Sequence, residues 1–64
     1  MDLWLAAAIH VSVGDVEGAE VYALRAMRHP QADESTRKAL VFDMPFAAIK
    51  DTAPWAKVVA ELRR

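Results

Sequence analysis

A Gly14-Asp15 pair, placed between two segments with helical patterns, constrains the fold of this chain most strongly. Glycine tolerates the left-handed conformation in which many helices end. An aspartate directly after it can accept backbone N–H bonds and so begin the next helix. Two helices joined by so short a turn lie side by side and antiparallel. The pair therefore predicts a helical hairpin near the N-terminus.

The segment before the turn, residues 2–13, is apolar on all sides of a helix, and only His10 and Ser12 interrupt it after Asp2. A negative charge such as Asp2 suits the start of a helix. A helix that is hydrophobic all round is usually buried on several sides. A few short helices can cover such a helix only in part. The segment is too short to span a bilayer, and no basic residue precedes it as in a signal peptide.

Two helical stripes run along this first helix, and one of them contains Leu5, Ile9 and Val13. We expect one stripe to join the core and the other to form an interface with a partner. The alternative is that the C-terminal helices cover both stripes. Because aromatic side chains are common interface anchors, we take the stripe with Trp4 as the interface. The candidate interface residues are Trp4, Ala8, Val11 and His10.

The segment after the turn predicts a second helix over residues 16–28. Acidic residues occupy its first turns and arginines its last turns, an order that the helix dipole favours. Gly18 costs about 1 kcal/mol of helix propensity relative to alanine, so we expect a close approach to the first helix there. Pro30 ends the hairpin.

The second half of the chain predicts two or three shorter helices. Asp33 is placed to cap a helix over residues 34–41. Two similar patterns, residues 43–47 and 52–56, each combine a capping residue, a proline, an aromatic residue and an alanine. Since proline is tolerated in the first turn of a helix, they predict a short turn over residues 45–50 and a final helix over residues 54–63. The aromatic residues expected in the core are Phe42, Phe46 and Trp55.

The fold class that these patterns predict is all-α, an antiparallel helical hairpin followed by two or three short helices. We expect one small domain over residues 1–64, with the hairpin at 2–30 and the short helices at 31–64 packed on it. Its 64 residues include no cysteine, and apolar residues make up 55% of them. A chain this short buries only about 60% of its unfolded surface, so either the core is unusually rich or some apolar surface belongs to a partner.

Residues 2–30 resemble a tetratricopeptide repeat, a helical hairpin that serves in protein recognition. Gly14-Asp15 matches the turn of that family, while Ala19 and Ala26 fall on its small positions in the second helix. Ala6 and His10 depart from the pattern of its first helix. The rest of the chain does not repeat the motif, and solenoids typically need at least three repeats. The resemblance implies a fragment, a terminal cap or a hairpin that a partner completes.

No group of residues predicts an enzyme, a cofactor or a metal site. His10 and His29 fall at opposite ends of the predicted hairpin, so they lack the convergence that a metal needs. The acids Asp15, Glu17 and Glu20 are explained by their place at a helix N-terminus. The hydroxyl residues lack a neighbouring base, and the glycines form no phosphate loop.

The sequence thus predicts a protein–protein interaction module, acting by self-association or by docking onto a larger assembly. The alternative is a small helical DNA-binding or regulatory protein. Against it, acids begin the second helix, where a recognition helix would meet phosphate, and the formal net charge is −1. We therefore expect no nucleic-acid partner, no membrane span and, without cysteines, a cytoplasmic location.

Overall fold

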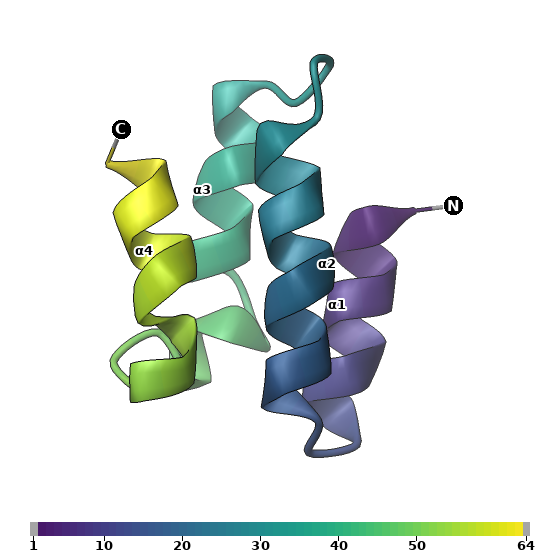
Figure 1. Ribbon diagram of the computed structural model, residues 1–64, viewed down its shortest axis with the longest axis vertical. Coiled ribbons are helices and arrows are strands. Elements are labelled where there is room, and N and C mark those ends of the chain that lie inside the picture. The colour runs from purple at the N-terminus through teal and green to yellow at the C-terminus, as the bar shows by residue number, and fades with distance from the viewer. Residues whose placement is uncertain (1, 64) are drawn as a thin grey trace.

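The computed structural model describes residues 2–63. In that range the chain forms α1 (Leu3–Ser12), α2 (Val16–Arg28), α3 (Glu34–Phe42) and α4 (Ala56–Leu62), with the 3-10 turns η1 (Phe46–Ala48) and η2 (Ala53–Trp55) before α4, and no strand. Figure 1 shows α1 on one side of α2 and the shorter helices on the other. The predicted all-α fold, a helical hairpin followed by shorter helices, is confirmed.

Helix bounds follow the predicted signals where capping is local. Gly14 adopts a φ of 84° at the turn, and the Asp15 carboxylate accepts a 3.0 Å hydrogen bond from the Gly18 N–H. Asp33 begins α3 by accepting a 2.7 Å bond from the Thr36 N–H. The final helix differs from its predicted bounds, because Pro54 lies in the 3-10 turn η2 and the α-helix begins only at Ala56.

The hairpin is held by small side chains. Ala7 of α1 and Ala19 and Ala23 of α2 are fully buried, which lets the two helices approach closely. A Cβ atom added at Gly18 would lie 2.9 Å from Cδ2 of His10 and would also collide with the Asp15 carboxylate. The predicted close approach at this glycine is therefore present.

Three aromatic side chains join the hairpin to the C-terminal half. Trp4 packs edge-on against Phe46 with ring centroids 5.4 Å apart, and Phe46 stacks on Trp55 at 5.3 Å. The Trp55 Nε1–H donates a 2.9 Å bond to the Leu40 carbonyl, so its one polar atom is satisfied inside the core. We call Trp4, Phe46 and Trp55 the aromatic column.

Phe42 corrects the sequence prediction, since its side chain is 60% exposed rather than part of the core. Its neighbours Leu40 and Val41 are buried and take the inward positions of the last turn of α3. The next residue along a helix points about 100° further round, because a turn has 3.6 residues. Phe42 is therefore directed away from the core.

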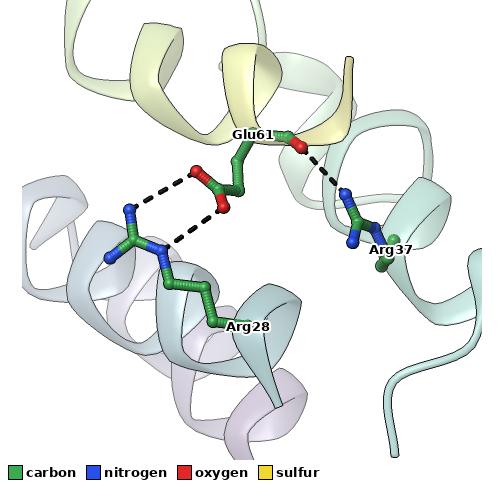
Figure 2. Close-up of polar contacts among 3 residues, drawn as sticks. All are labelled: Arg28, Arg37 and Glu61. Atoms are coloured by element: carbon green, nitrogen blue, oxygen red, sulfur yellow. Dashed lines mark hydrogen bonds and ion pairs between the residues drawn. The ribbon is translucent and has the colours of Figure 1, made fainter. Parts of the chain in front are cut away.

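The C-terminal helix is tied to both α2 and α3 through Glu61 (Figure 2). The Arg28 guanidinium contacts the Glu61 carboxylate at 3.4 Å. Arg37 donates a 2.8 Å bond to the Glu61 backbone carbonyl in the last turn of α4. Among residues 2–63 no helix is long and apolar enough to cross a membrane.

Candidate interaction surface

The structure places the predicted interface stripe of α1 against the rest of the chain. Trp4 is half-buried in the aromatic column, and Ala8 is only 9% exposed. Val11 is half-buried and packs on the core. This stripe therefore faces inward, and the assignment of core and exposed sides made from the sequence has to be reversed.

His10, the fourth candidate, is a contact within the hairpin. Its Nδ1 lies 2.7 Å from the Ala6 carbonyl, and its ring lies 4.9 Å from that of Tyr22 on α2. Arg25 in turn lies over the Tyr22 ring at 5.8 Å. These contacts fix the orientation of the imidazole across the helix pair.

The exposed side of α1 is the other apolar stripe. Leu5 is 50% exposed, Ile9 53% and Val13 74%. Successive members are four residues apart, so Leu5 and Ile9 lie in one row along α1, and Val13, the residue that caps its C-terminus, continues the row at the turn. We call Leu5, Ile9 and Val13 the outer stripe. It is the part of α1 that the shorter helices leave uncovered.

The polar groups around the outer stripe are already satisfied or absent. The Ser12 hydroxyl donates a 2.9 Å hydrogen bond to the Ala8 carbonyl. No aspartate, glutamate, lysine or arginine occurs between Asp2 and Asp15. Covering this face would therefore remove few polar groups from water, and desolvating unpaired polar groups is the main cost of burying a surface.

Among residues 2–63, the other large exposed apolar residues form no comparable row. Val21 of α2 is 49% exposed, while Phe42 and Met44, at the end of α3, are 60% and 68% exposed. Within residues 2–63, acidic residues and histidines form no group of three or more that could hold a metal ion.

Three basic side chains near the loop between α2 and α3 are paired within the chain. Arg28 and Arg37 both contact Glu61, as Figure 2 shows. Lys38 lies 3.6 Å from Glu34, one turn earlier in α3. Arg28 and Arg37 thus connect α2 and α3 to α4, whereas the Lys38 pair lies within α3.

No protein-family model, curated protein sequence or solved structure matches this chain. The resemblance of the hairpin to a tetratricopeptide repeat therefore stays a prediction, and function has to be argued from the surface itself.

Proposed function

We propose that this chain is a non-enzymatic protein–protein interaction module that binds through the outer stripe of α1, by self-association or by docking onto a larger assembly. The observation that carries the proposal is the row of exposed aliphatic side chains at Leu5, Ile9 and Val13. Single exposed apolar residues are ordinary, whereas contiguous ones mark interaction surfaces.

The mode of binding follows from the spacing of these residues. Partners recognise a helix by apolar anchors one turn apart that enter a hydrophobic groove or pack on a second helix. The inner side of α1 is fixed by the aromatic column and by the His10 contacts. The outer stripe is thus presented by an ordered helix, which lowers the conformational entropy lost on binding. We propose the cytoplasm as its location, because the chain has no cysteine.

Site-specific photo-cross-linking in living cells tests the proposal. A photoreactive phenylalanine analogue at Leu5 should give covalent adducts with protein, whereas the same group at Met44, which is also exposed, should not. Val13→Lys combined with the Leu5 probe should abolish the adducts, since it places a charge in the same row. Equal labelling from Leu5 and Met44, or adducts that survive Val13→Lys, would refute a binding role for the outer stripe.

A further inference from the structure

We infer that the occupant of the outer stripe is a second copy of this chain, with the two α1 helices antiparallel around a two-fold axis at Ile9. This inference rests on the proposed function, and it adds the identity and orientation of the partner.

The outer stripe is self-complementary in this arrangement. Ile9 lies midway between Leu5 and Val13, about 6 Å along the helix from each, given a rise of 1.5 Å per residue. A two-fold axis at Ile9 places Ile9 against itself and Leu5 against Val13 of the second copy. Isologous dimers require such a patch, which matches itself after a half-turn.

The charges at the two ends of the hairpin favour the antiparallel orientation. Exposed Asp15 and Glu17 lie at the turn. Arg25 lies near the opposite end and lines the same groove as Leu3 of α1, whereas the guanidinium of Arg28 is directed to Glu61 of α4. The helix dipole favours this order of charges within one chain.

In an antiparallel dimer the same order of charges brings the basic end of one chain to the acidic end of the other. With the axis at Ile9, Leu3 and the neighbouring Arg25 lie level with Asp15 of the other copy. Asp2, at the same end, is engaged within its own chain, where its carboxylate caps α1 through the Leu5 N–H. A parallel copy would instead oppose Arg25 to Arg25 and Asp15 to Asp15, which costs free energy.

The polar chemistry of the stripe also suits a dry contact between two identical helices. Ser12 satisfies its hydroxyl within α1, and no charged side chain lies between the two acids that flank the helix. One helical row from each copy makes an interface smaller than the roughly 1,200–2,000 Å² of stable complexes. We therefore expect a weak, concentration-dependent dimer.

Disulfide trapping tests both the partner and its orientation, because the chain contains no cysteine. Ile9→Cys should form a covalent dimer under mild oxidation, well above the level of the exposed control Met44→Cys. An equimolar mixture of Leu5→Cys and Val13→Cys should give more mixed disulfide than the sum of the two homodimers. A preference for homodimers of Leu5→Cys would refute the antiparallel orientation.

Sedimentation equilibrium of the unmodified chain supplies the second measurement. Ile9→Lys should shift the protein to monomer, and Met44→Lys should leave the dissociation constant unchanged. Arg25→Glu and Glu17→Lys should each weaken the dimer by roughly two- to tenfold, and the double variant should recover the loss. Circular dichroism of each variant checks that the helices remain.

A monomeric chain at all concentrations, with cysteine trapping no higher than at Met44, would refute a second copy as the occupant. If the Leu5 photoprobe still labelled other proteins in that case, the proposed function would stand with a different partner. If neither experiment gave a signal, both proposals would fail together.

Discussion

At the scale of single residues, Gly18 shows how a helix contact can outweigh helix propensity. Alanine is about 1 kcal/mol better than glycine inside a helix. At this position, however, the added Cβ would meet the Asp15 carboxylate and the His10 ring. Both groups are held by hydrogen bonds. The Asp15 carboxylate accepts a bond from the Gly18 N–H, and the His10 ring is hydrogen-bonded through Nδ1 to the Ala6 carbonyl.

We expect Gly18→Ala to lower the free energy of unfolding by about 1 kcal/mol, because a disturbed cap and a disturbed hydrogen bond each cost about that much against the gain in propensity. Urea unfolding followed by circular dichroism measures the change. In a His10→Ala background the same substitution should cost less, since one of the two obstacles is gone. An unchanged or larger cost in that background would argue against the contact.

Asp33 gives a residue-scale prediction about pH. The backbone N–H of Thr36, followed by its hydroxyl, holds the pKa of the Asp33 carboxyl below its ordinary value of 3.8. A lowered pKa in the folded state means that the unfolded chain binds more protons. The contribution of Asp33 to stability is therefore present above the ordinary pKa and is lost as the pH falls through the lowered one.

Asp33→Asn should reduce the loss of stability below about pH 4 while keeping the cap, because asparagine also caps helices well. Urea unfolding at a series of pH values compares the two chains. Side-chain carboxyl NMR titration of the native chain should give a pKa for Asp33 below 3.8. Parallel pH profiles for the two chains would contradict the assignment.

At the scale of elements, α4 depends on its neighbours for stability. It covers only Ala56–Leu62, and isolated helices shorter than about 12–15 residues are marginal in water. Burial of Val58 and the bond from Arg37 to the Glu61 carbonyl hold it in place. The contact between Arg28 and Glu61 is 3.4 Å long, and the arginine side chain is largely exposed, so we expect little stability from it.

Arg37→Ala should lower the free energy of unfolding by about 1 kcal/mol through loss of a hydrogen bond from a charged donor. Hydrogen exchange should speed up most for the amides of α4. Lys38→Ala is the matched control, because its exposed pair with Glu34 is worth only a few tenths of a kcal/mol. Equal effects of the two substitutions would show that Arg37 does not hold the helix.

At the scale of the whole molecule, the aromatic column makes one unit of the hairpin and the shorter helices. Phe46 is fully buried between Trp4 and Trp55. It comes from a 3-10 turn, so its position depends on both halves of the chain rather than on a long helix of its own.

Phe46→Ala should lower the free energy of unfolding by about 3–5 kcal/mol, enough to unfold much of so small a domain. Circular dichroism and the emission of Trp4 and Trp55 report the loss. Phe42→Ala, at an exposed position, should change stability by less than about 0.5 kcal/mol. Similar losses for the two phenylalanines would contradict the central place of the column.

The hairpin, its turn and the start of each long helix could be derived from the amino-acid sequence. Gly14, Asp15 and Asp33 act on backbone groups within a few residues of themselves, so their effects can be derived from local spacing. The second helix accordingly has the predicted bounds, residues 16–28. The burial of Trp55 was also predictable, from an aromatic residue in a short apolar stripe.

Which side of α1 is exposed depends on contacts between distant parts of the chain. A helix that is apolar all round has no polar side to indicate where solvent lies, so both stripes were equally suited to the core. Phe46 settles the choice by packing against Trp4, and this contact between distant parts of the chain leaves Leu5, Ile9 and Val13 outside. The proposed interaction surface is thus the side of α1 that the core leaves uncovered, and no local pattern in α1 predicts which side that is.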